Sequence, residues 1–276
     1  MRDAPTVHEA GDARLVVDAD DGARIASFTV RGEELLHTGT GGGHLYGSFV
    51  MAPFAGRIRD ARARHGDHRI EVAAQPDDGH GLHGLVHSRP WRRVGDDRWR
   101  IDLAAADPAH PGPTTGWFAP LGIEQQLTLT SGALHLRLTV TSQAPAPVTV
   151  GWHPWFRRTI AGRPVQVGLA AGAMLRRDAT GIATTEHVDV PPQPWDDAFV
   201  DLDGPVTLDW GADGAGDRPL QLSIDTDGPV VVVFTGRDHA VCVEPQSGPP
   251  DEANLPDPRL VTPDEPLTLT SIWRWA

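Results

Sequence analysis

Residues 123–140 hold the stretch that decides the fold: Ile123-Glu-Gln-Gln-Leu-Thr-Leu-Thr130, then Ser131 and Gly132, then Ala133-Leu-His-Leu-Arg-Leu-Thr-Val140. Apolar and polar residues alternate in both halves. This period of two is typical of a β-strand with one buried face, whereas an amphipathic helix repeats every 3.6 residues. The stretch therefore predicts half-buried strands.

The same alternation recurs along most of the chain, and no long amphipathic helix interrupts it. Further segments with strand character begin at Arg14, Ala23, Val148, Leu220, Val230, Val241 and Leu267. Between them, 30 glycines and 25 prolines provide turns rather than crossover helices. The pattern predicts an all-β, mainly antiparallel sandwich with few short helices and long functional loops.

The chain has 276 residues, which is enough to bury a large hydrophobic core. Strand signals run from about Arg14 to Trp273 without a break in composition. The most linker-like stretch, residues 107–116, is short and lies between strands, so we interpret it as a loop. We therefore expect a single domain over residues 1–276.

Composition excludes several classes of chemistry. All 24 basic residues are arginine, so lysine Schiff bases, pyridoxal phosphate attachment and a phosphate-loop lysine are impossible. The lone cysteine, Cys242, rules out an internal disulfide and a tetrahedral site of thiolates. A net charge of −13 should repel nucleic acid and anionic membranes. A small molecule is the expected partner.

The sequence predicts neither a membrane span nor an export signal. No apolar run approaches the roughly 20 residues of a transmembrane helix. The first ten residues are polar and acidic, without the apolar core of a secretory signal peptide. We expect a cytoplasmic protein, either a monomer or a homodimer, with no membrane contact.

Two segments before residue 90 break the strand pattern. Arg57 follows a glycine turn in Pro53-Phe-Ala-Gly-Arg-Ile-Arg-Asp, where its guanidinium could bind sugar hydroxyls or a carboxylate, or simply form a surface ion pair. His80, His83 and His87 lie within eight residues that include two glycines. They could supply three imidazoles to zinc. Alternatively, one of them bonds a ligand while the others bond the loop backbone.

Two later segments carry titratable groups beside strands. His153 lies in Gly151-Trp-His-Pro-Trp-Phe, flanked by tryptophans that could stack on a sugar or simply pack in the core. Glu244 ends an apolar strand just before a proline-rich loop. A carboxyl group there tends to be desolvated, which raises its pKa and suits a general base, although a salt-bridged glutamate would look the same.

Taken together and in this order, these motifs resemble the aldose 1-epimerase, or galactose mutarotase, family over most of the chain. Arg57 matches the family's Arg-Ile turn and His83 its Leu-His-Gly histidine. The other matches are His153 in Gly-x-His-Pro-aromatic-Phe, Asp196 in Trp-Asp-Asp-Ala-Phe, and Glu244 in Glu-Pro-Gln-x-x-Pro-x-x-x-x-Asn. The resemblance implies a β-supersandwich whose concave face holds a sugar.

The resemblance also implies the reaction and the roles of the residues. The α and β anomers of a hexose or hexose derivative would interconvert through ring opening and closing. Glu244 would be the base at the C1 hydroxyl and His153 the acid at the ring oxygen. The implied substrate-binding residues are Arg57, His83, Asp196, Trp155 and Gln246. Such a reaction needs one acid and one base, and neither a cofactor nor a metal.

Some questions stay open at this level. The doublet Asp196-Asp197 leaves two candidates for the sugar-binding aspartate, and His80 stands where many galactose mutarotases carry Asn. The sugar could carry a phosphate or a sulfonate, which would need extra cations such as Arg59, Arg89, Arg157 or Arg158.

Three other functions compete with a mutarotase. They are a non-catalytic carbohydrate-binding protein, a glycosidase with two carboxylates, and a metal-dependent isomerase that uses the clustered histidines.

Overall fold

The computed structural model describes residues 4–39, 43–107, 109, 112–211 and 219–276. Within these residues the chain forms two large antiparallel sheets, four small two-stranded sheets and three short 3-10 helices. The predicted all-β fold with few short helices is therefore confirmed. No helix in this part of the chain is long and apolar enough to cross a membrane.

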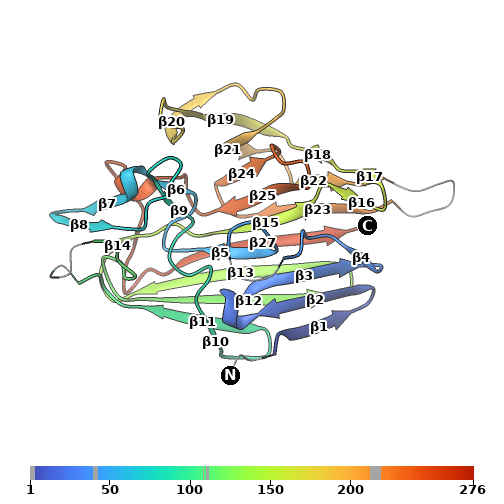
Figure 1. Ribbon diagram of the computed structural model, residues 1–276, viewed down its shortest axis with the longest axis horizontal. Helices are drawn as coiled ribbons and strands as arrows, with labels where there is room; N and C mark the ends of the chain where they lie inside the picture. The colour runs from blue at the N-terminus through green and yellow to red at the C-terminus, as the bar shows by residue number, and fades with distance from the viewer. Residues whose placement is uncertain (1–3, 40–42, 108, 110–111, 212–218) are drawn as a thin grey trace.

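The larger sheet has eleven strands (Figure 1). In spatial order they are β1 (Thr6–Ala10), β2 (Ala13–Asp18), β3 (Arg24–Val30), β5 (Ser48–Met51), β15 (Gly151–Arg157), β25 (Ala240–Gln246), β24 (Val230–Phe234), β21 (Asp196–Leu202), β19 (Ala171–Arg177) and β20 (Ala183–Val188), with β4 (Glu33–Glu34) paired to β3.

The smaller sheet has eight strands. In spatial order they are β10 (Arg92–Arg93), β11 (Arg98–Leu103), β12 (Leu121–Thr130), β13 (Ala133–Ser142), β27 (Leu267–Trp275), β23 (Gln221–Thr226), β22 (Val206–Asp209) and β18 (Gln166–Gly168). The stretch at 123–140 forms the β12–β13 hairpin, whose strands pair from Leu121–Ser142 to Thr130–Ala133.

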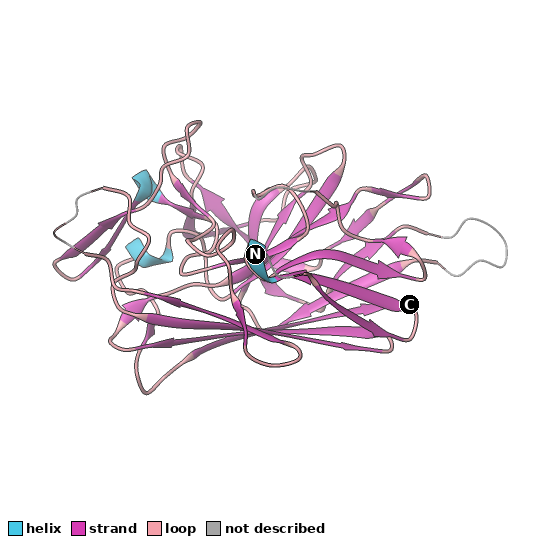
Figure 2. Ribbon diagram, turned by 60° about the horizontal axis from the view of Figure 1, so that its bottom comes forward, coloured by secondary structure: helices cyan, strands magenta, loops and turns pink. Residues whose placement is uncertain are grey.

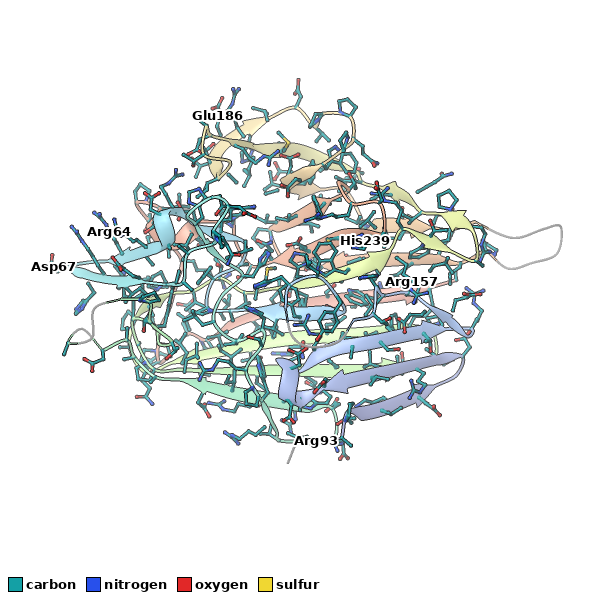
Figure 3. The ribbon with its side chains drawn as sticks, in the orientation of Figure 1. Arg64, Asp67, Arg93, Arg157, Glu186 and His239 are labelled. Atoms are coloured by element: carbon teal, nitrogen blue, oxygen red, sulfur yellow. The ribbon has the colours of Figure 1, made fainter. Side chains whose placement is uncertain are left out.

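The remaining elements are short. Small sheets pair β6 (Arg57–Ile58) with β9 (Gly81–Leu82), β7 (Arg62–His65) with β8 (His68–Glu71), β14 (Ala146–Pro147) with β26 (Leu260–Val261), and β16 (Thr159–Ile160) with β17 (Arg163–Pro164). The 3-10 helices are η1 (Ala19–Asp21), η2 (Arg59–Ala61) and η3 (Glu252–Asn254). The β7–β8 hairpin, with Arg64 and Asp67, projects at the left of the molecule (Figures 1 and 3).

The main hydrophobic core lies between the two large sheets, which form two layers (Figure 2). Leu136 and Leu138 of the smaller sheet and Trp152 and Phe156 of the larger one belong to the same buried cluster. Gln125 occupies an inward position of β12, where the alternation of the strand places a polar residue in the core. It bonds to the carbonyl of Ala23 at 2.7 Å and accepts the indole N–H of Trp152 at 2.9 Å. These bonds satisfy the buried amide and connect the two layers.

The central strands β15 and β25 of the larger sheet are buried on both faces. Trp152 and Phe156 point into the main core, whereas His153 and Trp155 point to the opposite face, which we call the outer face. The predicted strand at 148–152 is displaced, because β15 begins at Gly151 and His153 lies inside it. The candidate catalytic residues His153 and Glu244 lie on this outer face.

Candidate active site

The strand register arranges the outer face in rows that cross the larger sheet. In one row, Phe49 of β5 faces His153 of β15, while Val232 of β24 faces both Glu244 of β25 and Ala198 of β21. Alternation along each strand keeps these residues on one face. His153 and Glu244 therefore project from adjacent strands toward the same space.

The next row lies one pleat further along the same strands. Cys242 faces Trp155 on one side and Phe234 on the other, and Phe234 faces Asp196. The ladder between β15 and β25 runs through Cys242 and resumes at Gln246, with Pro154 and Pro245 lying in the interval. Proline donates no ladder hydrogen bond, so it loosens the pairing where His153 and Glu244 meet.

A cavity of about 300 Å³ opens above these rows. That volume is at the lower end of the range for small-molecule sites and suits one small ligand. All seven residues singled out as catalytic or substrate-binding line it, namely Arg57, His83, His153, Trp155, Asp196, Glu244 and Gln246. The structure therefore brings together residues that are up to 189 positions apart in the sequence, as Arg57 and Gln246 show.

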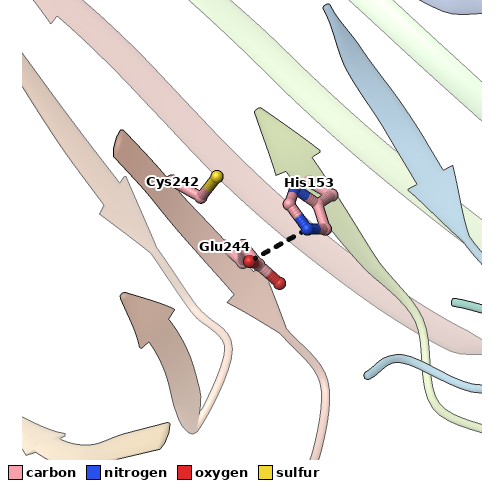
Figure 4. A group of neighbouring side chains, drawn as sticks. All are labelled: His153, Cys242 and Glu244. Carbon is pink, nitrogen blue, oxygen red and sulfur yellow. Dashed lines mark ion pairs between the residues drawn. The ribbon is translucent and has the colours of Figure 1, made fainter. Parts of the chain in front are cut away.

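The His153 ring is held on three sides by aromatic neighbours. It stacks on Phe49, with centroids 4.8 Å apart, and on Trp155 at 5.1 Å, while His83 meets it edge-on at 4.7 Å. Nε2 lies 3.3 Å from Oε1 of Glu244 (Figure 4). This packing fixes the plane of the ring and aims Nε2 at the carboxyl group.

Burial sets the protonation of the pair. Glu244 is 3% exposed and His153 is 4% exposed. Burial raises the pKa of Glu244 well above its usual value, and Asp196 raises it further. Burial lowers the pKa of His153 to about 3, with His44 contributing. Both shifts favour the neutral forms of the two side chains, with the proton on Glu244 rather than on His153, because a low-dielectric site disfavours charge.

Gln246 contacts the pair directly, whereas Arg57 pairs with a carboxylate outside it. The side-chain amide of Gln246 donates to Oε2 of Glu244 at 3.3 Å. Arg57 is on β6 and donates to Oδ2 of Asp78 at 3.0 Å, so its charge is partly neutralised. Both side chains line the cavity.

The turn that carries His83 depends on Gly84. His83 has a left-handed backbone (φ 58°), and its N–H donates to the carbonyl of Gly56 at 2.8 Å. A Cβ at Gly84 would lie 2.2 Å from the carbonyl oxygen of Ala52. Glycine is therefore required for this close backbone approach, which holds His83 over the outer face.

Both aspartates of the doublet line the cavity, but they differ in exposure. The Asp196 side chain is 45% exposed, and its Oδ2 is 3.4 Å from Nη1 of Arg177. The Asp197 side chain is only 9% exposed and pairs with Nε of Arg177 at 3.0 Å. Asp196 is therefore the aspartate available to a ligand, and Asp197 anchors Arg177.

His80 belongs to a clamp at the rim of the cavity. Its Nδ1 accepts the N–H of Asp60 at 3.1 Å, and its Nε2 is 3.3 Å from the carbonyl oxygen of Thr180 in the β19–β20 turn. Arg59 supports the same contact through ion pairs with Asp178 at 2.8 Å and Asp251 at 3.3 Å. His80 thus bonds the loop backbone, and it does not join His83 and His87 in a metal site.

The four arginines considered as extra cations do not line the cavity. Arg59 is in the clamp. The other three donate to backbone carbonyl groups: Arg89 to Thr115, Arg157 to Leu36, and Arg158 to Thr235. Arg177 and Arg237 line the cavity instead. The local sequence did not single out Arg177 or Arg237 as site residues, because arginine supplies all 24 Lys and Arg positions of the chain and its presence alone marks no site.

The buried histidines, His87 among them, should make the free energy of unfolding depend on pH. Burial lowers the pKa values of His83, His87 (to about 4) and His153 (to about 3) from the usual 6.5, whereas burial raises that of Glu244. As pH falls from 6.5 to 4.5, the unfolded chain takes up protons on these three histidines that burial largely excludes from the folded chain, and the opposite shift of the single Glu244 offsets only part of this difference. The free energy of unfolding should therefore fall with falling pH.

Replacing His87 removes one of these protons. In urea titrations between pH 6.5 and 4.5, His87→Gln should reduce the slope of unfolding free energy against pH by up to about 1.4 kcal/mol per pH unit. The control is His135→Gln, which removes an exposed imidazole from β13, outside the cavity. Equal slopes for wild type and His87→Gln would contradict the burial of a neutral His87.

Comparison with known proteins identifies the family. The family model described as aldose 1-epimerase matches residues 8–273. A search of curated proteins found no significant relative. Solved structures with a similar fold include a candidate aldose 1-epimerase from Escherichia coli K12, with a TM-score of 0.77, 20% identity and coverage of 99% of both chains.

An aldose epimerase homologue from C. elegans has a TM-score of 0.76 and 15% identity and covers 99% of both chains. Galactose 1-epimerase from Lactobacillus acidophilus has a TM-score of 0.72 and 17% identity, covering 98% of this chain and 92% of its own. At these identities the structures show a shared fold, and the family match extends across nearly the whole sequence. The chain belongs to the aldose 1-epimerase family.

Proposed function

We propose that the protein is a cofactor-independent mutarotase that interconverts the α and β anomers of a hexose. The observation that carries this proposal is the buried pair of His153 and Glu244, 3.3 Å apart on the floor of a cavity of about 300 Å³. Ring opening needs a base at one sugar oxygen and an acid at another. The pair supplies both and holds the one proton that the reaction requires.

The proton moves in a closed cycle. When the sugar binds, the proton of the pair passes to His153, and hydrogen bonds from the sugar stabilise the Glu244 carboxylate. Glu244 then takes the proton of the C1 hydroxyl while His153 gives its proton to the ring oxygen. The electron pair of the bond between C1 and the ring oxygen goes to that oxygen, and C1 becomes an aldehyde.

Ring closure reverses these steps on the other face of the carbonyl. Opening leaves Glu244 protonated and His153 neutral, which is the form that burial favours in the empty site. Rotation about C1–C2 turns the aldehyde over. His153 then takes the proton of the C5 hydroxyl as this oxygen attacks C1, and Glu244 protonates the new C1 oxygen. We assign Arg57, His83 and Asp196 to the sugar hydroxyls and Trp155 to a face of the ring.

Polarimetry tests this function. Pure α-glucose or α-galactose is dissolved with catalytic amounts of protein, and the approach to equilibrium rotation is followed. The mutarotase should accelerate the decay in proportion to protein concentration without changing its end point. An unchanged rate for every hexose tested would contradict the proposal, and sugar binding in the same samples would favour a non-catalytic carbohydrate-binding protein.

An anionic hexose derivative is a second candidate substrate, and Arg237 favours it. Of the three arginines that line the cavity, Arg57 and Arg177 pair with carboxylates. Arg237 is exposed, and within the described residues it has no carboxylate partner. It could therefore bind a phosphate or sulfonate on the sugar.

Arg237→Gln separates the two substrate classes. A charged hydrogen bond contributes roughly 1.5–3 kcal/mol, so the variant should raise KM for a hexose 6-phosphate or a sulfonated hexose by about ten-fold or more. KM for a neutral hexose should stay unchanged. Arg64→Gln, on the distant β7–β8 hairpin (Figure 3), is the control. Equal effects of Arg237→Gln on charged and neutral sugars would contradict an anion-binding role.

A further inference from the structure

Cys242 is a third potential ligand beside the acid/base pair, and the mutarotase mechanism does not use it. It lies two residues before Glu244 on β25 and opposite Trp155 of β15, so its thiol shares the outer face with the pair. One ligand atom each from His153, Cys242 and Glu244 all lie within 4.8 Å of one another (Figure 4). Among the described residues, no other three His, Cys, Asp or Glu side chains bring their ligand atoms this close together.

The spacing of the three atoms fits a tetrahedral zinc ion. Typical Zn–N and Zn–O bonds of about 2.1 Å place two ligand atoms roughly 3.4 Å apart at a tetrahedral angle. The distance between Nε2 of His153 and Oε1 of Glu244 is 3.3 Å. A Zn–S bond of about 2.3 Å places sulfur roughly 3.6 Å from either atom, which is inside the 4.8 Å limit that the three side chains meet, so a small shift of the thiol completes the set. The cavity leaves the fourth position open to water or sugar.

We propose that His153, Cys242 and Glu244 form an inhibitory binding site for Zn²⁺ or a similar borderline-soft divalent cation. Mixed nitrogen, sulfur and oxygen ligands select such ions over Mg²⁺ or Ca²⁺. Binding releases the proton of the thiol and the proton shared by the pair, and the ion then lies among one thiolate, one carboxylate and one neutral imidazole. Its charge of +2 is balanced by two negative ligands, so the buried site stays neutral.

Occupancy would stop mutarotation, because the ion holds the lone pairs of His153 and Glu244 that transfer protons. This inhibition rests on the proposed function, whereas metal binding itself does not. A Cys242 that only fills space in the apolar patch with Phe49, Trp155 and Ala240 would make no difference to metal affinity. The effect of removing the thiol on metal affinity therefore distinguishes a metal site from simple packing.

The test uses Co²⁺ as a spectroscopic probe and Zn²⁺ as the ion measured by competition with a chromophoric chelator. Chelator-treated wild type should bind one Co²⁺ per chain with a near-ultraviolet thiolate charge-transfer band and visible bands of tetrahedral cobalt. Cys242→Ala should lose the charge-transfer band and bind Zn²⁺ at least ten-fold more weakly. Cys242→Ser provides a second variant if Cys242→Ala is unstable, and His87→Gln is the control that keeps all three ligands.

Activity supplies an independent readout. Without metal, Cys242→Ala should retain wild-type mutarotation, and it should resist a Zn²⁺ concentration that inhibits wild type. Absence of the charge-transfer band in wild type, or unchanged Zn²⁺ affinity in both cysteine variants, would overturn the metal site. A cysteine-dependent cobalt spectrum in a protein without mutarotase activity would uphold the metal site and contradict the proposed function instead.

Discussion

Glu244→Gln is expected to abolish anomer interconversion while leaving sugar binding nearly intact. The amide keeps the shape of the side chain but cannot accept the proton of the C1 hydroxyl. General base catalysis contributes roughly 10²–10⁴-fold, and loss of the base also removes the partner that returns the proton, so kcat should fall by at least the upper end of that range. KM should change little, because the loss occurs in the transition state.

Exchange kinetics and sugar binding are measured on the same Glu244→Gln preparation. The control is Glu186→Gln, at an exposed position on β20 whose partner is Arg176 (Figure 3). This control has the same chemical change outside the cavity and should behave as wild type. Turnover near the wild-type rate in Glu244→Gln would remove Glu244 from the role of base.

His153→Asn should produce a loss of similar size for a different reason. Asn has no titratable nitrogen, so the ring oxygen receives no proton from the position that His153 holds between Phe49 and Trp155. We expect kcat to fall by about 10²–10⁴-fold. His135→Asn, on the exposed side of β13 in the smaller sheet, is the matched control. Unchanged kinetics in His153→Asn would assign the acid to another group.

The double variant of His153→Asn and Glu244→Gln tests whether the two residues act as a unit. Groups that share one proton give strongly non-additive effects, because removing either one disables both. The double variant should therefore be little slower than the slower single variant. Losses that multiply would show that the two residues act independently and would contradict the shared-proton cycle.

Much of the fold could be predicted from local sequence patterns. The alternation in 123–140 predicted the half-buried strands that form the β12–β13 hairpin, because a hairpin with one solvent face is specified by residues close together in the chain. Gln125 shows where the pattern fails. Its inward position is explained only by its partners in the fold, which are Trp152 of the larger sheet and the carbonyl group of Ala23 in the turn before β3.

The main residues of the site could be found from motifs, but their surroundings could not. Arg177 enters the cavity because β19 pairs with β21, and this long-range pairing leaves no local signal. The clamp formed by His80 likewise depends on Thr180, 100 residues away. Cys242 did carry a signal, since the alternation Val241-Cys-Val-Glu244 places the thiol and the carboxyl group on one face.

Two-dimensional exchange NMR at anomeric equilibrium tests the central claim most directly, because it detects interconversion without any chemical perturbation. Wild-type protein with a hexose should give cross-peaks between the α and β C1 protons, which grow with protein concentration and disappear in Glu244→Gln. Line broadening that shows sugar binding, together with exchange no faster than in protein-free buffer for neutral and anionic hexoses alike, would contradict the account.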